Sequence, residues 1–264
     1  MLYALKEISK PVLIAASITL GIFLLIEFLP IKSRLNTREI RFVIFEGQTV
    51  KEINKSLKEY NVLKEGDSFL NVDQNLEGYL FPDTYYFYKN SSSAVILEKI
   101  FKNFYKKADP ILSQDGENYD RNLIIASLIE KEVPSSDERR IVAGIILKRL
   151  EVGMPLQVDA TLCYIKSYAY SLGQKADSGV DSEIESCYPI TKKDKEVDSL
   201  YNTYLYKGIP PKPISNPGED AIRAVFEAKS SPYWYYLSDP VTKKTIFSKT
   251  LEEHNINRRR YLSN

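Results

Sequence analysis

Histidine and cysteine, the residues most often used for metal binding and neutral-pH catalysis, are nearly missing from this sequence. Its 264 residues include one His and two Cys. A His/Cys metal cluster is therefore not expected, and a Ser–His–Asp triad would depend on His254 alone. We interpret His254 as a helix-surface residue more readily than as a catalyst, so acid–base chemistry has to come from Glu, Asp, Tyr or Lys.

An excess of charge of one sign is also missing. Lys and Arg number 36 and Asp and Glu number 35, which gives a net charge of +1. Such a balance provides no basic field for nucleic acid, and we expect no nucleic-acid partner. Apolar residues make up 44% and charged residues 27% of the chain, which is typical of globular proteins. At about 100–200 residues per domain, the length allows one or two domains.

One long hydrophobic run stands near the amino terminus, at residues 12–29. It just spans a hydrocarbon core of about 30 Å at about 1.5 Å per residue. A retained single-pass helix is our first interpretation; a cleaved signal peptide and a buried core helix are the alternatives. A signal peptide has an apolar core of about 7–15 residues and a small-residue cleavage site, and neither is present here. The flanking charges leave the orientation open, and we expect a cytoplasmic tail and an exported remainder.

The two cysteines, Cys163 and Cys187, are compatible with export. An exported protein favours a disulfide between them, and closing this loop would stabilise the fold by about 3 kcal/mol. The alternative is two free buried thiols.

Hydrophobic periodicity divides the rest of the chain into short elements. A polar linker precedes an alternating strand at 41–47, and helical spacing follows over 50–60. Further helices are predicted over 94–108, 123–133, 138–153, 218–229 and 251–262. Two segments, 109–121 and 165–200, are predicted to be polar loops, and the segments 233–239 and 245–249 are predicted to form a hairpin. Asn216 is a candidate cap for the helix that begins near 218.

Two glutamates end the apolar segment 123–133. A helix that is apolar nearly all round is buried, and Glu130 and Glu132 point to opposite faces of it because they lie about 200° apart. Glu132 follows the buried stripe, where desolvation would raise the pKa of its carboxyl and suit a general acid. The alternative is a helix-end charge paired with Lys131, Arg139 or Arg140.

Other polar residues lie among apolar or aromatic ones. Glu77 and Tyr79 stand in an aromatic-rich stretch that suits a sugar-binding groove, although the same aromatics could simply be strand and core residues. Asp159 and the segment 201–204 (YNTY) are weaker candidates. The YWYY run at 233–236 is most simply a strand.

Together these segments resemble the membrane-anchored endolytic murein transglycosylases (MltG or YceG-like). Five stretches match in family order over about 180 residues: 76–87, 123–133, 138–164, 201–225 and 235–255. Residues of the 42–63 segment resemble the family's LysM-like submodule, and the segment 165–200 looks longer than is typical.

The resemblance implies an α+β fold with an amino-terminal transmembrane helix, a small LysM-like α/β subdomain and a larger mixed α+β catalytic domain. The corresponding boundaries are 1–11 for a cytoplasmic tail, 12–30 for the transmembrane helix, 31–67 for a linker and the LysM-like subdomain, and 68–264 for the catalytic transglycosylase domain. The protein would be a single-pass protein of the cytoplasmic membrane, with its catalytic domain on the extracytoplasmic side.

The resemblance also implies cleavage of the β-1,4 bond between N-acetylmuramic acid and N-acetylglucosamine in nascent peptidoglycan strands. The product would be a 1,6-anhydro end, and strand elongation would stop. Glu132 matches the catalytic glutamate, and no metal or cofactor is expected. Candidate strand-binding residues in the matching stretches are Glu77, Tyr79, Asp159, Thr161, Tyr201, Asn202, Thr203 and Asn216. Peptidoglycan synthases are candidate partners.

Two other functions remain open on the sequence. One is a non-catalytic cell-wall glycan-binding or scaffolding protein of the same fold. The other is a hydrolase with two catalytic carboxylates, Glu132 with Glu77 or Asp159.

Overall fold

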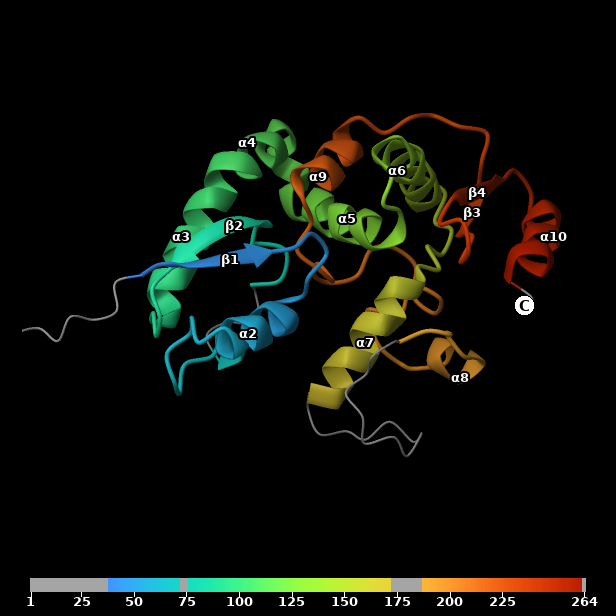
Figure 1. The fold of residues 1–264 in the computed structure, drawn as a ribbon. Coiled ribbons are helices and arrows are strands. Elements are labelled where there is room, and N and C mark those ends of the chain that lie inside the picture. The colour runs from blue at the N-terminus through green and yellow to red at the C-terminus, as the bar shows by residue number, and fades with distance from the viewer. Residues whose placement is uncertain (1–37, 72–75, 172–186, 263–264) are drawn as a thin grey trace, which may run out of the picture. The chain divides into compact units, whose positions relative to one another are not determined.

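The computed structural model describes residues 38–71, 76–171 and 187–262. The predicted tail and transmembrane helix, residues 1–30, lie outside these ranges. Of the helices in the described ranges, none combines the length and the apolar character that a membrane span needs. Contacts group Ile40–Asn264 into one unit. Its described part combines helices with two-stranded sheets, which makes it a mixed α+β fold (Figure 1).

The amino-terminal lobe is built around a two-stranded antiparallel sheet. Its elements are β1 (Ile40–Ile44), α2 (Val50–Glu59), the 3-10 turn Phe69–Asn71, β2 (Asp83–Phe87) and α3 (Ser93–Lys107). Phe42 pairs with Tyr85 across the sheet, and strand alternation turns both rings into the first hydrophobic core. Thr49 begins α2 through a capping box with Glu52. The strand and helix predicted at 41–60 are therefore confirmed.

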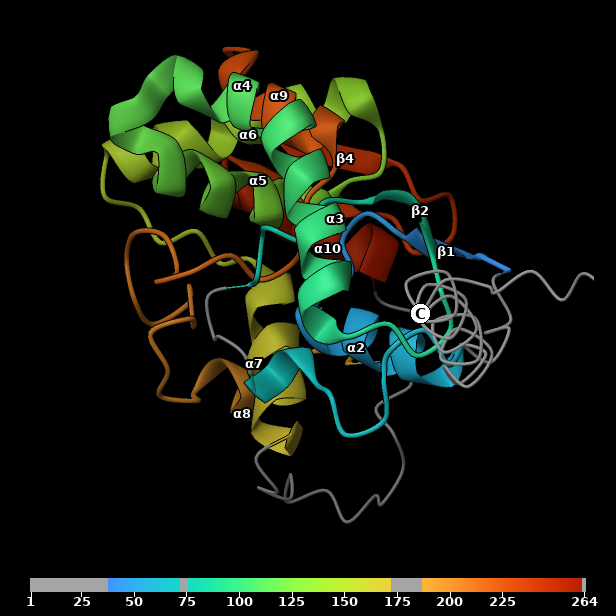
Figure 2. The same cartoon turned by 90° about the vertical axis from the view of Figure 1, so that its left-hand side faces the viewer.

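This first core extends past residue 67, the predicted end of the LysM-like subdomain. The partner strand of β1 is β2, and Ile96 and Ile100 of α3 are buried in the same core. Helix α3 then continues to α4 and links this lobe to the helical layer (Figure 2).

A layer of helices holds the second hydrophobic core. Its elements are α4 (Asp109–Leu112), the 3-10 turn Ser113–Asn118, α5 (Tyr119–Glu132), α6 (Ser136–Glu151), α7 (Asp159–Ser171) and α9 (Glu219–Phe226). Helix α5 is buried on every side between Asn122 and Ile129. It packs against α6, α7 and α9, as a helix that is apolar all round requires.

Two predicted loops are wrong in part. The segment 109–121 forms α4, the 3-10 turn and the start of α5. Pro110 suits the first turn of a helix, and the buried Ile111 and Leu112 anchor it. The start of the predicted loop 165–200 belongs to α7, which runs to Ser171. Helix α7 begins among the buried residues Val158, Ala160, Thr161 and Leu162, so tertiary packing fixes its start.

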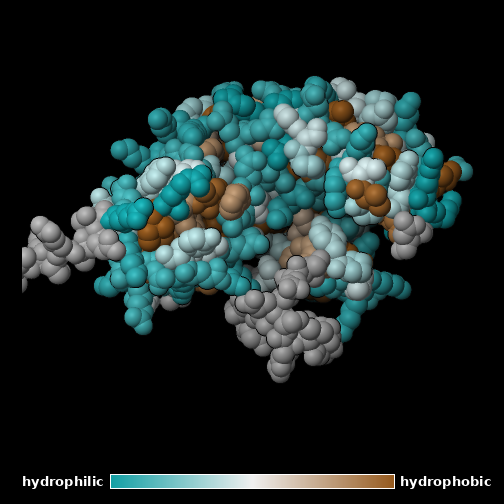
Figure 3. Space-filling view, in the orientation of Figure 1, coloured by the Kyte–Doolittle hydropathy of each residue, from teal (hydrophilic) through white to brown (hydrophobic). Residues whose placement is uncertain are grey.

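The carboxyl-terminal part contains α8 (Lys192–Lys195), β3 (Tyr235–Ser238), β4 (Thr245–Ser248) and α10 (Leu251–Leu262). The predicted hairpin is confirmed as the antiparallel pair β3–β4, and the predicted terminal helix as α10. The face in Figure 3 is mostly hydrophilic, and some of its apolar areas lie over the two small sheets and α10. A two-stranded sheet with one packed face leaves such side chains on its open face.

The prediction that Asn216 caps α9 is wrong. Gly218 occupies the N-cap position of this helix, without a side-chain cap. Asn216 is fully buried, and its amide is bonded to other segments of the chain. Since its side chain serves those partners, it is not available to the first turn of α9.

Candidate active site

Glu132 is the last residue of α5, and its side chain lies where three elements meet. The chain turns extended at Val133, and Pro134 follows in the sequence. The N–H of Ala160, in the first turn of α7, and the phenol of Tyr236, in β3, both donate hydrogen bonds to the Glu132 carboxylate. Ser238 of β3 also donates to the Glu132 carbonyl at 3.4 Å. The hairpin and the start of α7 therefore fix the position of this carboxyl.

The surroundings of Glu132 suit an acid that works near neutral pH. Burial raises the pKa of Glu132 to about 7, and the negative charge of Asp159 acts in the same direction. The phenol of Tyr236, the Ala160 N–H and the charge of Arg149 oppose the shift. A carboxyl with this pKa holds its proton for a large fraction of the time at pH 7, which a general acid requires.

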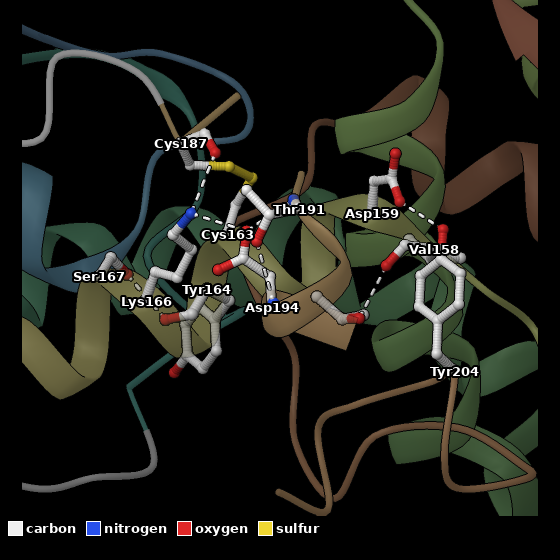
Figure 4. Close-up of a disulfide and its surroundings, with 11 residues drawn as sticks. Val158, Asp159, Cys163, Tyr164, Lys166, Ser167, Cys187, Thr191, Asp194 and Tyr204 are labelled. Atoms are coloured by element: carbon white, nitrogen blue, oxygen red, sulfur yellow. Dashed lines mark hydrogen bonds and ion pairs between the residues drawn. A yellow bond between two sulfur atoms is a disulfide. The ribbon is translucent and has the colours of Figure 1, made fainter. Parts of the chain in front are cut away.

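Asp159 and Tyr204 form a second polar pair beside the acid. The phenol of Tyr204 donates to the Asp159 carboxylate (Figure 4), and burial, followed by the charge of Asp159, raises the pKa of Tyr204 well above its usual value. The adjacent Thr203 explains this placement: its carbonyl accepts from Gln157 N–H at 3.1 Å and its hydroxyl from Val158 N–H at 2.9 Å. These two bonds set the residues that follow, Asp159 and Tyr204, opposite each other.

Arg149 of α6 fixes the hairpin that carries Tyr236. Its side chain is 5% exposed. The guanidinium donates to the Trp234 carbonyl at 2.8 and 2.5 Å and to the Leu156 carbonyl at 2.7 Å. It also lies 5.3 Å from the ring centre of Tyr235. These donors bind backbone carbonyls and not the Glu132 carboxylate. Arg149 therefore lowers the pKa of Glu132 through its charge, and it also fixes the position of β3.

Glu130, on the other face of α5, is held in an ion pair. It lies 2.6 Å from Arg139 in an ion pair and accepts from the Gly218 N–H at 2.9 Å. The cations that could have paired with Glu132 are occupied elsewhere. Arg139 and Arg140 contact Asp220, and Lys131 donates to the Gly47 carbonyl. The geometry therefore favours Glu132 as the acid and Glu130 as a structural group, in line with their predicted opposite faces.

Glu77 and Asn216 lie in the contact between the two lobes rather than in a sugar groove. Glu77 accepts from the Val50 N–H at 3.1 Å, at the start of α2, and from the Asn216 amide at 3.1 Å. Burial raises the pKa of Glu77 to about 8, although the Val50 N–H opposes the shift. Both side chains are buried and bonded to the protein, so they hold segments together.

The remaining predicted binding residues mostly shape loops. Tyr79 packs on Phe104 and donates to Asp120. Thr161, Asn202 and Thr203 are buried and bonded to nearby backbone or to each other. Tyr201 packs against Tyr164, with 5.1 Å between ring centres. Of the predicted binding residues, the structure brings Asp159 beside Glu132.

Sequence reasoning missed Tyr236 and Arg149 as parts of this site. Alternation predicts Tyr236 only as one ring of a strand, since it does not say which neighbour each strand face meets. No sequence pattern distinguishes Arg149 from the other charged residues of its predicted helix. His254 packs on Tyr235, the strand neighbour of Tyr236, with 5.3 Å between ring centres, and burial lowers the pKa of its imidazole.

The Cys163–Cys187 pair forms a disulfide, with 5.4 Å between its Cα atoms (Figure 4). It joins α7 to the segment that precedes α8. A large cavity of about 850 Å³ lies elsewhere, along α6, and is lined by Gly144, Leu147 and Lys148 among others. None of the polar groups around Glu132 lines it.

Comparisons with known proteins place this chain in a family. The YceG-like family model matches residues 12–260. A Bacillus subtilis (strain 168) endolytic murein transglycosylase is 33% identical over 219 residues, 80% of this chain and 55% of the relative. One from Streptococcus pneumoniae serotype 2 is 31% identical over 185 residues, 69% of this chain and 31% of the relative. This chain thus spans about half or less of the length of these curated relatives.

A solved structure agrees with the sequence matches. The crystal structure of a yceG-like protein from Listeria monocytogenes superposes with a TM-score of 0.63 and 31% identity. The match covers 82% of this chain and 75% of that one. The resemblance stated from the sequence is confirmed: this chain belongs to the YceG-like family.

Proposed function

We propose that this protein is an endolytic lytic transglycosylase of peptidoglycan, with Glu132 as its catalytic acid. The observation that carries the proposal is the Glu132 carboxyl, raised in pKa to about 7 and facing the Asp159–Tyr204 pair. The similarity to relatives named endolytic murein transglycosylases supports the substrate class.

In the proposed reaction, a nascent strand places the bond between N-acetylmuramic acid and N-acetylglucosamine beside Glu132. The acid gives its proton to the glycosidic oxygen as the C–O bond breaks. The Glu132 carboxylate then takes the proton of the muramyl C6 hydroxyl, whose oxygen bonds to the anomeric carbon. The product is a 1,6-anhydro end, the acid is regenerated and no water is consumed.

The surrounding residues have distinct tasks in this reaction. Tyr236 and the Ala160 N–H hold the carboxylate that forms after the first proton transfer. The negative charge of Asp159 stabilises positive charge that develops at the anomeric carbon. An internal nucleophile has a high effective molarity, so the reaction needs one acid–base residue where an ordinary glycosidase needs two.

The proposal includes the place of action. Residues 12–30 would anchor the chain in the cytoplasmic membrane, with the catalytic part on the extracytoplasmic side. The anchor would confine cleavage to strands close to where they are made, end their elongation there, and bring the enzyme near peptidoglycan synthases.

Asp159 favours one alternative function, a hydrolase with two carboxylates. Its charge acts on Glu132, whereas Glu77 is bonded at the start of α2 and is no longer a candidate for this role. A hydrolase would use Asp159 as base or nucleophile and add water to the new end. The second alternative is a glycan-binding scaffold without activity.

Mass spectrometry of the products tests all three functions. The full chain, purified in mild detergent, is incubated with purified peptidoglycan beside a Glu132→Gln control. Internal cuts with 1,6-anhydro-muramyl ends, absent in the control, are expected. Water-added ends would identify the hydrolase, and binding without any cleavage would identify the scaffold.

A further inference from the structure

Tyr188 is the residue that the disulfide brings to the active site. It follows Cys187 directly in the chain, and Cys187 is bonded to Cys163 in α7. Cys163 lies four residues after Asp159 in the same helix, so both side chains project from one face of α7. The disulfide therefore fastens the start of the 187–194 segment one helical turn from the Asp159–Tyr204 pair (Figure 4).

A second attachment holds the same segment. Lys166 of α7 donates to the Cys187 carbonyl at 3.4 Å and lies 3.1 Å from the Asp194 carboxylate. Asp194 in turn forms a capping box with Thr191 at the start of α8. The segment is thus fixed to α7 at both of its ends, and Tyr188 cannot move far from that helix.

The side chain of Tyr188 is both near the acid and open to solvent. Burial, followed by the charges of Glu132 and Asp159, raises the pKa of its phenol to about 12, so the phenol lies within electrostatic reach of both carboxylates. The residue is nevertheless 55% exposed. Large exposed aromatic side chains beside a polar site are typical contact groups for ligands with apolar faces.

We propose that Tyr188 is a substrate-contact residue whose ring packs against a sugar of the glycan strand, and that the Cys163–Cys187 disulfide holds the ring in place for this contact. The inference rests on the proposed function, because the strand is its ligand. A pyranose face carries C–H groups that pack on an aromatic ring. Fixing the ring before binding reduces the entropy lost when the strand binds.

Binding without turnover tests this inference. In the full-length Glu132→Gln protein, the affinity for peptide-free, uncross-linked glycan strands is measured by titration calorimetry. Replacing Tyr188 with Ala is expected to weaken binding roughly fivefold or more, because a packed aromatic ring is lost. Tyr188→Phe keeps the ring and should bind like the parent. Tyr105→Ala, which removes a 61% exposed tyrosine from α3, is the matched control and should change nothing.

Opening the disulfide tests the tether. Dithiothreitol gives two electrons and two protons to the disulfide, yields two thiols and closes to its own cyclic disulfide. The folded, reduced and alkylated protein, checked by circular dichroism, is expected to lose affinity as the Tyr188→Ala variant does. Reduction of the disulfide should then cause no further loss of affinity in the Tyr188→Ala variant. The Cys163→Ser, Cys187→Ser double variant is the genetic counterpart.

The outcomes separate this inference from the proposed function. Wild type that cuts strands, together with a Tyr188→Ala variant of unchanged affinity, would overturn the inference alone. Loss of affinity on Tyr188→Ala but not on reduction would overturn the tether. Wild type that neither binds nor cuts strands would overturn the proposed function, and this inference with it.

Discussion

Two glutamates only two residues apart differ in the groups that face them. Glu130 meets a guanidinium and a backbone N–H, which balance its charge. Glu132 meets a phenol, one N–H and the like charge of Asp159. The Arg149 guanidinium acts on Glu132 only through its charge, because its donors bind backbone carbonyls. One glutamate is therefore suited to holding α5 in place, and the other to transferring a proton.

Replacing Glu132 with Gln should abolish strand cleavage, by about 10³-fold or more, because the amide cannot transfer the proton. The fold should be preserved. The pKa of Glu132 is about 7 in the folded protein, against an ordinary value of 4.5. Its protonation therefore stabilises the folded state fully below pH 4.5, and this stabilisation is lost as the pH rises to about 7. The variant should therefore gain stability relative to wild type over this range, by up to roughly 3 kcal/mol.

Urea unfolding of both proteins at several pH values between 4.5 and 8 measures this difference. Glu130→Gln is the control: it breaks the ion pair with Arg139 and should destabilise the protein at every pH in the series. A stability difference between wild type and Glu132→Gln that does not change with pH would contradict the assigned pKa.

Tyr236→Phe should raise the pKa of Glu132 further, because the lost phenol favours the charged carboxylate. The carboxyl would then keep its proton to higher pH. The alkaline limb of the pH profile of kcat/KM should move to higher pH. The rate should fall by about tenfold, because the phenol no longer positions the acid. Tyr235→Phe, on the neighbouring position of β3, should leave the limb where it is. A downward shift for Tyr236→Phe would be inconsistent with this hydrogen bond.

At the residue scale, the sequence predicts an acid better than it predicts the acid's neighbours. Glu132 could be singled out because a fully apolar helix ends in carboxylates, and because the family resemblance points to the same position. Glu77 resembled a binding residue because it stands among aromatic residues, and Asn216 because it lies in a stretch that matches the family, yet both are bonded to distant segments. Tyr236 meets Glu132 across more than a hundred residues of chain, a pairing that no local pattern encodes.

At the element scale, α6 holds the hairpin through its last turn. Lys148 donates to the carbonyls of Ser231 and Tyr233, and Arg149 donates to the carbonyl of Trp234. These bonds reach the approach to β3 and so determine where Tyr236 lies. The hairpin itself was predictable from alternation and a turn, but its docking depends on side chains of a helix far away in sequence.

Arg149→Met should therefore loosen the hairpin while keeping much of the side chain's apolar volume. The carbonyls of Trp234 and Leu156 would lose their donors, and stability should fall by about 3 kcal/mol. Hydrogen exchange should rise over 233–248, measured by mass spectrometry. Arg140→Met, which removes a guanidinium of the same helix that pairs with Asp220 and Glu227 instead of the hairpin, is the matched control and should leave exchange in the hairpin unchanged. Unchanged protection in Arg149→Met would show that other contacts dock the hairpin.

At the scale of the whole molecule, two hydrophobic cores are joined by a small polar contact around Asn216. Its amide oxygen accepts from the N–H groups of Gly78 and Leu80 at 2.9 and 2.8 Å. Its amide nitrogen donates to the Gln48 carbonyl and to Glu77. One side chain thus connects three segments, from both lobes. Periodicity predicted the helices of each lobe, but it could not predict this contact, because its partners lie up to 168 positions apart.

Asn216→Ala should uncouple the unfolding of the two lobes. The variant leaves two buried N–H groups without an acceptor, and it should lose about 2–4 kcal/mol of stability. Trp234 is the only tryptophan in the chain, so its fluorescence follows the lobe that holds the hairpin, whereas far-ultraviolet circular dichroism follows both lobes. In wild type the two urea transitions should coincide. In Asn216→Ala the circular dichroism should begin to change at lower urea than the fluorescence, because the amino-terminal lobe unfolds first.

Asn202→Ala, which removes a buried amide bonded within its own loop, is the matched control; it should lower both midpoints together. Coincident transitions in Asn216→Ala would mean that apolar contacts, such as those along α3, couple the lobes without this amide.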